Sequence, residues 1–276
     1  MDYGNTIGEA FAYTKDGLLG NIGTWILLII LSVLPAIPFI LIMVMFLVML
    51  GPESAFTGTP GMAGAMPNWI VLATWFGIAF ILAILLSAFY SGYTLKILRG
   101  IKPLPAVTGF MTLFTDGIKY FVIQFVYMIP ALIVFCATVG PALLELITAA
   151  MAGGEMPTAP GIWLGMMGGI LLTIVVAFIC GLIALGGVVR FARTGSVGEG
   201  FNFSAILETI GKIGWGTYII ALIIMGIVIF VVTIVISIIP FIGGILQLIL
   251  APWIGVFSMR YICMLFDTAG GSTPSP

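Results

Sequence analysis

The basic residues of this chain are confined to four short clusters, and long apolar runs without Lys or Arg separate these clusters. The clusters are Lys15, Lys96 to Lys119, Arg190 to Lys212, and Arg260. Each run between them is long enough for two membrane crossings of about 20 residues. Since Lys and Arg stay on the cytoplasmic side of a membrane protein, every cluster is expected to return to the same face. The pattern therefore predicts six spans, with both the N-terminus and the C-terminus in the cytoplasm.

The composition favours a helical membrane protein and excludes several classes of function. Hydrophobic residues make up 62% and charged residues 7% of the chain, whereas about a quarter of the residues in soluble proteins are charged. The chain has no His, which removes the commonest metal ligand and general base. Cys136, Cys180 and Cys263 are interpreted as small packing residues. We expect no enzymatic activity, cofactor or metal, and no binding of nucleic acid, which needs a broad basic surface.

Six apolar runs have the length of a membrane span. They lie at about 22–50, 69–98, 118–146, 162–189, 217–239 and 245–266, and residues 269–276 form a Gly/Ser/Pro-rich tail that we expect to be disordered. A charge at the middle of a membrane costs about 2.5 to 3.5 kcal/mol, and proteins keep such charges where ions or protons travel. The middles of these six runs carry none. Their absence disfavours a proton- or sodium-coupled pump.

A repeated pattern precedes the first, third and fifth spans. Apolar residues at helical spacing form one face of a short amphipathic segment in each copy: Ile7, Ala10, Phe11, Thr14 and Leu18; Val107, Phe110, Met111, Phe114 and Ile118; and Phe203, Ile206, Leu207 and Ile210. We predict an all-α integral membrane domain of three pseudo-repeats, at about 1–99, 100–195 and 196–268. Each would contain an interfacial helix, a span outward and a span back.

Small residues recur every four positions in the three return spans. They are Ala79, Ala83 and Ser87 in the second span, Gly165, Gly169, Thr173, Ala177 and Gly181 in the fourth, and Ala251 and Gly255 in the sixth. Such a ridge lets helix backbones approach closely in lipid. We therefore expect the three return helices to pack together at the centre, with the outgoing helices around them.

Basic residues mark the inner ends of the same return helices. Lys96, Arg99, Lys102, Arg190, Arg193 and Arg260 are predicted to form a positive collar at the inner mouth of the bundle. One hypothesis is that this collar binds anionic lipid head groups, a phosphate-bearing ligand or an acidic partner. The other is that these charges only set the orientation of the helices.

Several phrases are similar to a known family. The segments 100–107 (GIKPLPAV), 113–119 (LFTDGIK), 127–131 (YMIPA) and 190–196 (RFARTGS) resemble an uncharacterised, mostly archaeal family of membrane proteins known as domain of unknown function 4013. The resemblance implies an archaeal or bacterial plasma membrane and brings no activity with it.

Two classes of function remain open from the sequence. The first is a non-enzymatic membrane protein that acts as a scaffold, an accessory subunit or a lipid-organising element, with membrane lipids and another membrane protein as partners. The alternative is a passive or facilitated transporter or channel for a small neutral or anionic solute, which would need a continuous polar cavity. An intramembrane hydrolase is disfavoured, because the sequence offers no paired nucleophile and base.

Overall fold

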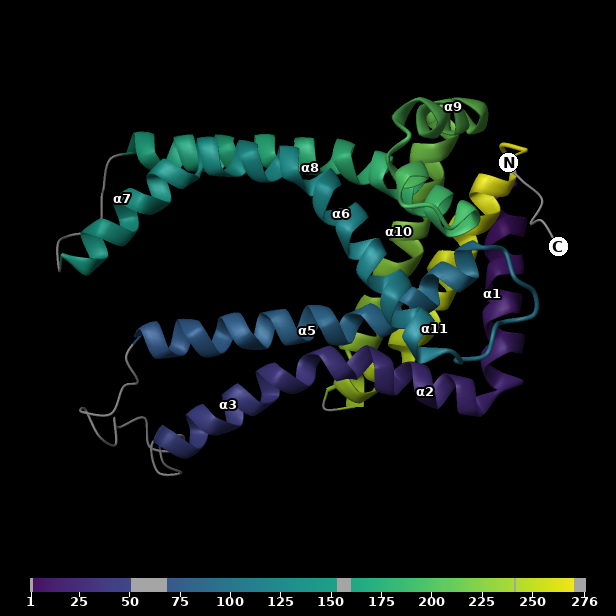
Figure 1. The fold of residues 1–276 in the computed structure, drawn as a ribbon, viewed down its shortest axis with the longest axis horizontal. Coiled ribbons are helices and arrows are strands. Elements are labelled where there is room, and N and C mark those ends of the chain that lie inside the picture. The colour runs from purple at the N-terminus through teal and green to yellow at the C-terminus, as the bar shows by residue number, and fades with distance from the viewer. Residues whose placement is uncertain (1, 51–68, 153–159, 241, 271–276) are drawn as a thin grey trace.

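The computed structural model describes residues 2–50, 69–152, 160–240 and 242–270, and this part of the chain is helical with no strand. The order of its elements is shown in Figure 1: α1 (Tyr3–Leu19), α2 (Ile22–Val33), the 3-10 turn η1 (Leu34–Ala36), α3 (Ile37–Leu50), α5 (Trp69–Leu98), α6 (Phe110–Thr138), α7 (Gly140–Met151), α8 (Pro160–Thr194), the 3-10 turn η2 (Gly198–Phe201), α9 (Phe203–Ile213), α10 (Trp215–Ser237) and α11 (Ile242–Asp267). Most of the predicted disordered tail, residues 271–276, lies outside the described residues.

The described residues contain six helical segments that are long and apolar enough to cross a membrane. They are α2–α3 taken together, α5, α6, α8, α10 and α11, so the predicted set of six spans is confirmed, and the chain is a multi-pass membrane protein by its helices. The third span ends at Thr138, earlier than predicted, and the chain continues as the separate helix α7. Pro141 lies in the first turn of α7, where a missing backbone N–H costs nothing.

The prolines of the outgoing spans act differently. In the first span Pro35 lies in the 3-10 turn η1 that separates α2 from α3. A proline removes a backbone hydrogen bond and clashes with the preceding turn, which explains the break. In the third span Pro130 lies inside α6, and the helix continues to Thr138.

Two of the three predicted short amphipathic helices are separate elements. α1 ends at Gly20, where the side chain of Asn21 caps α2 by accepting from the backbone of Thr24 at 3.1 Å. α9 ends at Gly214, whose φ of +89° favours glycine. The predicted second helix is wrong as a separate element, because α6 runs unbroken through this segment. Lys119 and Tyr120 follow it where the other copies have a terminating glycine, so the three-repeat organisation stays a prediction.

The helices form two arms that diverge from one end of the molecule. Figure 1 shows α3 with α5 in one arm and α7 with α8 in the other, and α1 lies crosswise at the end where the arms join. α6 connects the arms, because it packs against both α5 and α8. We call the end that holds α1, α9 and the C-terminal ends of α5, α8 and α11 the inner end, and the opposite halves of the spans the outer arms.

Burial is concentrated at the inner end. The two buried clusters include Tyr93 and Leu95 of α5 and Tyr261 of α11, all fully buried. In the outer arms large apolar side chains remain exposed, among them Phe80 at 60% on α5 and Leu171 at 65% on α8. Such a surface is covered by hydrocarbon in a membrane, so the arms face lipid.

Candidate functional site

The inner ends of the three return helices meet through hydrogen bonds to backbone carbonyls. Arg99, the first residue after α5, donates its Nε to the carbonyl oxygen of Ala192 on α8 at 3.1 Å. Arg193 of α8 donates Nη2 to the carbonyl oxygen of Cys263 on α11 at 3.1 Å, and the Cys263 thiol lies 3.6 Å from the carbonyl oxygen of Leu98 on α5. α5, α8 and α11 are thus joined in a triangle at their last turns, although their outer halves diverge.

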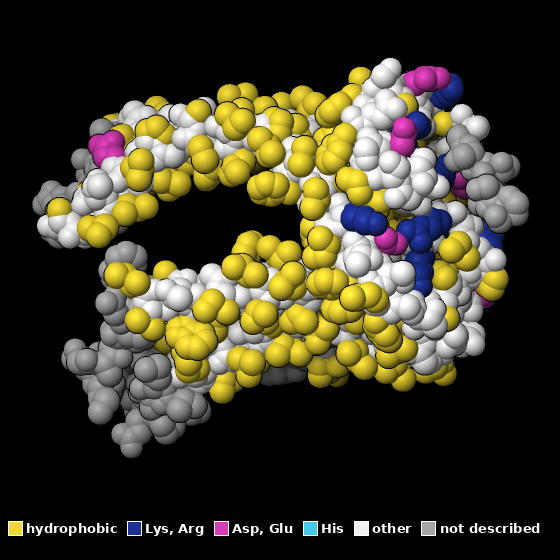
Figure 2. All heavy atoms as spheres, viewed as in Figure 1, with side chains coloured by type: hydrophobic (Ala, Val, Ile, Leu, Met, Phe, Trp, Pro, Cys, Tyr) yellow, Lys and Arg dark blue, Asp and Glu magenta, His cyan; other side chains and the backbone are white. Residues whose placement is uncertain are grey.

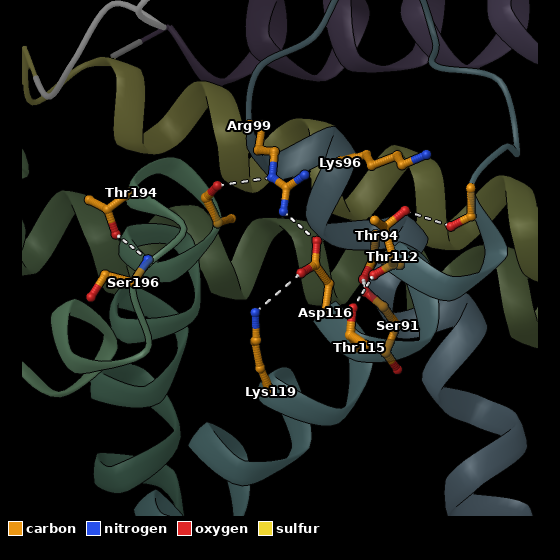
Figure 3. Close-up of polar contacts among 12 residues, drawn as sticks. Ser91, Thr94, Lys96, Arg99, Thr112, Thr115, Asp116, Lys119, Thr194 and Ser196 are labelled. Atoms are coloured by element: carbon orange, nitrogen blue, oxygen red, sulfur yellow. Dashed lines mark hydrogen bonds and ion pairs between the residues drawn. The ribbon is translucent and has the colours of Figure 1, made fainter.

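Four charged residues of α5 and α6 form one group, which we call the α5–α6 basic cluster. It consists of Lys96, Arg99, Asp116 and Lys119. Arg99 donates Nη2 to Asp116 at 2.5 Å, and the Lys119 ammonium lies 4.0 Å from the same carboxylate. Lys96 donates to the carbonyl oxygen of Thr108 at 2.7 Å. Figure 3 shows Arg99, Asp116 and Lys119 on the side of α5 that faces Thr194, with Lys96 extending away from them. Three cations and one carboxylate give the cluster a net charge of +2.

Lys119 was missing from the collar predicted from sequence. Its spacing to Asp116, three residues away on the same helix, already indicated a local pair. The sequence pattern had assigned Asp116 to a short interfacial helix and Lys119 to the start of the third span, whereas both lie on the continuous helix α6. Lys102 is exposed on the loop between α5 and α6.

The remaining pairs of the inner end lie around α8 and α9. Arg190 pairs with Glu199 of η2 at 2.5 Å, and Arg193 pairs with Asp267 of α11 at 2.5 Å. Lys212 pairs with Glu208 on α9 at 2.8 Å. The hydrogen bond from Lys212 is the main reason that the pKa of the Glu208 carboxyl lies below its usual value.

Arg260 differs from the other residues of the predicted collar. It is 3% exposed, and its guanidinium carbon lies 4.8 Å from the centre of the Tyr13 ring, a cation–π contact with α1. Among the described residues no carboxylate lies within 4.0 Å of it. Burial raises the pKa of Tyr13 to about 12, against the opposing effect of Arg260. Arg260 therefore holds α1 against α11 from a buried position, and its charge is not exposed at the inner end.

The small-residue ridges face different neighbours and do not face one another. Ala79 is buried in a groove shared with Ile42 of α3. A Cβ at Gly169 would stand 2.7 Å from Thr138 Oγ1 of α6, and one at Gly255 would collide with the Tyr90 hydroxyl of α5. Gly165 and Gly181 have open space beside them, and five further ridge residues are half-buried: Ala83, Ser87, Thr173, Ala177 and Ala251. The expected trio of return helices thus exists only at the inner end.

The closest helix contact uses glycines that the ridge pattern did not include. A Cβ at Gly92 of α5 would collide with the carbonyl oxygen of Leu113, and one at Gly117 of α6 would collide with that of Ala88. Ala88 and Gly92 are four residues apart, the spacing that permits close backbone approach. This small-residue pair lies one position beyond Ser87 on the same helix, and it was the signal that could have located the contact.

The outer arms enclose an apolar cleft. Figure 2 shows the space between the arms lined by hydrophobic side chains, with Lys, Arg and acidic side chains gathered beyond its closed end. Polar groups of the spans mostly bond within their own helix, as Thr173 does to Gly169 and Thr233 to Ile229, both at 2.8 Å. The described residues include no cluster of three metal-ligating side chains. The charged groups beyond the closed end can bind an anion, and the apolar cleft can hold hydrocarbon chains.

Comparison with known proteins gives a family without an assigned role. Residues 75–241 match the model of a family described as "Protein of unknown function (DUF4013)". This match covers more than half of the chain, from the second span into the loop before the sixth. No curated protein and no solved structure matches the chain at a significant level.

Proposed function

The chain belongs to the family described as "Protein of unknown function (DUF4013)", and we propose on structural grounds that it is a non-enzymatic, lipid-organising membrane protein. In this proposal one anionic phospholipid is held with its acyl chains in the cleft between the arms and its head group at the α5–α6 basic cluster. The observation that carries the proposal is the position of this cluster between the inner ends of α5 and α8, the helices whose outer halves form the two arms.

The charge of the cluster supports an anionic head group. Lys96, Arg99 and Lys119 outnumber Asp116, and Lys96 is hydrogen-bonded to a backbone carbonyl, which leaves its charge unneutralised. Each Lys or Arg near a membrane surface contributes about 1 kcal/mol to attraction of anionic lipid. The Arg99 fork also suits a phosphate, because its planar N–H groups can serve two oxygens at once.

The apolar lining of the cleft supports lipid over a transported polar solute. Exposed side chains of the arms, such as Ile81 on α5 and Ile174 on α8, are apolar and offer no hydrogen bonds to a solute that has left water. The cavities found within the spans are also lined by apolar residues, as in the groove formed by Val228, Trp253 and their neighbours. A passive transporter would need polar groups along this route.

The orientation and location follow from the charges. The inner end carries the Lys and Arg side chains, so we place it, together with both chain termini, in the cytoplasm. The plasma membrane of an archaeal or bacterial cell is what the resemblance to the family implies. The three pseudo-repeats remain our interpretation of the sequence. A membrane-protein partner that enters the same cleft would act as a competitor of the lipid.

Thermal unfolding in mixed micelles tests the proposal. We expect phosphatidylglycerol to raise the Tm of the full chain more than phosphatidylcholine does, because only the former carries a net negative charge. The double variant Arg99→Gln/Lys119→Gln should lose most of this difference. Lys15→Gln, an exposed cation on α1, is the matched control and should keep it. Equal stabilisation by both lipids contradicts the proposal.

A flux assay tests the alternative function, a passive or facilitated transporter. Vesicles that contain the purified chain should show no more leakage of small neutral or anionic solutes than empty vesicles do. Saturable flux that the Arg99→Gln variant abolishes would instead support the transporter. Purification of a stoichiometric second protein with the chain would favour an accessory-subunit role.

A further inference from the structure

A second basic site lies between α8 and α9, separate from the α5–α6 basic cluster. It is a cavity of about 380 Å³. Arg190, Arg193 and Lys212 contribute cations to its lining, and Gly186, Val189 and Phe266 contribute an apolar floor. This volume lies in the range of ligand pockets, which is about 300 to 1,000 Å³. The site therefore combines a charged wall with space for a small organic group.

The walls of this cavity are fixed by close packing. The position of a Cβ on Gly186 would be 2.7 Å from Cγ2 of Ile206, so α9 sits directly against the backbone of α8. Asn202 caps α9 by accepting from the backbone of Ala205 at 3.3 Å. Arg190 joins η2 to α8 through Glu199, with Nε donating at 2.7 Å. The cations are thus held around the cavity by three different elements.

Each cation of the wall already has one carboxylate, and the three pairs differ in their exposure to water: the Arg190–Glu199 pair is partly exposed, and the Arg193 side chain is only 13% exposed. The side chains of Lys212 and Glu208 are both more than half exposed, and Asp267 is half exposed beside Arg193. Glu208 also lines the cavity. Exposed ion pairs are weak, because water and salt screen them. An anion can therefore replace Glu208 as the partner of Lys212 at low cost, while Arg190 and Arg193 keep their carboxylates and share their N–H groups with it.

We propose that this cavity binds a phosphomonoester group attached to a small apolar body. A phosphomonoester near neutral pH carries close to two negative charges and three acceptor oxygens, which matches two guanidinium groups and one ammonium group. The apolar floor accommodates the hydrocarbon part of the ligand. The same group occurs in soluble organic phosphates and in the head group of phosphatidic acid. The site uses none of the residues assigned to the lipid cleft.

Isothermal titration of the full chain in detergent tests this site with two sources of the group. Glycerol phosphate and inorganic phosphate are the soluble probes, and phosphatidic acid in mixed micelles is the lipid probe, all measured against chloride at equal ionic strength. We expect saturable binding of at least one source. Phosphatidic acid is measured in the Arg99→Gln/Lys119→Gln background, so that the α5–α6 basic cluster does not contribute to its binding. Lys212→Gln should weaken binding by roughly tenfold, which is the scale of one charge-assisted hydrogen bond, and Lys15→Gln on α1 should leave it unchanged.

A second variant separates loss of binding from loss of folding. Ala205 lines the cavity, and Ala205→Leu fills the space without removing a cation. It should abolish binding while the Tm stays close to that of the parent chain. Binding of the soluble probes identifies a soluble ligand, and binding of phosphatidic acid alone identifies a lipid head group. The proposal is overturned if neither source binds above the chloride control, or if Ala205→Leu binds as well as the parent chain.

Discussion

The inner end and the outer arms of this bundle are stabilised by different interactions. At the inner end, hydroxyl groups of buried tyrosines connect different elements: Tyr127 donates to the carbonyl oxygen of Gly200 at 2.8 Å, and Tyr218 donates to that of Leu182 at 2.8 Å. In the outer arms, hydroxyl groups such as that of Thr173 bond to their own helix. The inner end is thus a self-supporting core, whereas the arms depend on lipid for much of their contact.

The two regions also have different parts in the proposed function. The inner end is closely packed and carries basic groups at its edges, while the arms offer apolar surface without specificity. A lipid-organising protein needs both, since affinity for a head group comes from fixed charges and capacity for acyl chains comes from open apolar walls.

The largest effect is expected where α5 and α6 touch. Gly92→Ala and Gly117→Ala each place a Cβ on a backbone carbonyl of the facing helix, so the helices must separate. We expect a loss of about 3 kcal/mol in unfolding free energy, the upper part of the range for overpacking. Gly77→Ala, in the outer half of the same helix, has open space beside it and should change stability by no more than about 1 kcal/mol.

Thermal unfolding monitored by Trp fluorescence in detergent measures all three variants. The contrast between the two regions is broken if Gly77→Ala is as destabilising as Gly92→Ala.

A smaller effect is expected from the buried tyrosine hydroxyls. Tyr218→Phe removes the donor to the Leu182 carbonyl between α10 and α8, and the net cost of one such hydrogen bond is about 1 kcal/mol. Thr173→Val in the outer arm removes only a bond within α8 and should cost less than about 0.5 kcal/mol. Denaturant titration of the two variants in parallel checks the order, and a larger cost for Thr173→Val would reverse it.

The ion pair of Arg99 and Asp116 should contribute less still. Both side chains are partly exposed, so solvent screening limits the coupling energy to about 1 kcal/mol or less. A double-mutant cycle with Arg99→Gln and Asp116→Asn measures this coupling. A coupling of several kcal/mol would indicate that the cluster is a structural anchor, and the head-group site would then need revision.

The smallest effect concerns the pH dependence of α9. Since the pKa of Glu208 is lowered by its bond to Lys212, the pair stabilises α9 at pH values above the ordinary carboxyl pKa. This contribution is lost as the pH falls through the lowered pKa of the folded state. The Tm difference between the parent chain and Glu208→Gln should therefore be small at pH 7 and vanish in acid. A difference that grows as the pH falls has the wrong sign for this account.

The spans could be predicted from sequence because hydrophobic length alone defines them. The C-terminal ends of α1 and α9 are also of a kind that sequence can predict, since a glycine follows the last residue of each helix. The continuous course of α6 could not be predicted, because the repeat suggested that a short helix ends near Ile118. After this residue the chain has neither a terminating glycine nor a capping residue, and α6 continues. A repeat in sequence predicts equivalent segments, but local residues decide whether each helix stops.

The candidate site was predicted only in part. Arg99 and Arg193, which the sequence predicted at the inner ends of their helices, bond there to neighbouring return helices, and their role in a basic collar stays a prediction. The burial of Arg260 against Tyr13 was not visible, because it depends on how α1 docks against α11. The small-residue ridges showed which positions allow close helix contacts, but they did not show which helix each one contacts. The rotation of a helix about its axis, which decides this, is set by tertiary packing.

Native mass spectrometry of the chain released from nanodiscs tests the central claim most directly. The nanodiscs contain phosphatidylglycerol and phosphatidylcholine in equal amounts, and the lipids retained on the protein are counted. We predict that phosphatidylglycerol is retained in preference to phosphatidylcholine, and that Arg99→Gln/Lys119→Gln loses this preference while Lys15→Gln keeps it. Retention of both lipids in equal amounts by the parent chain would contradict the proposal that the cleft and the α5–α6 basic cluster form one lipid site.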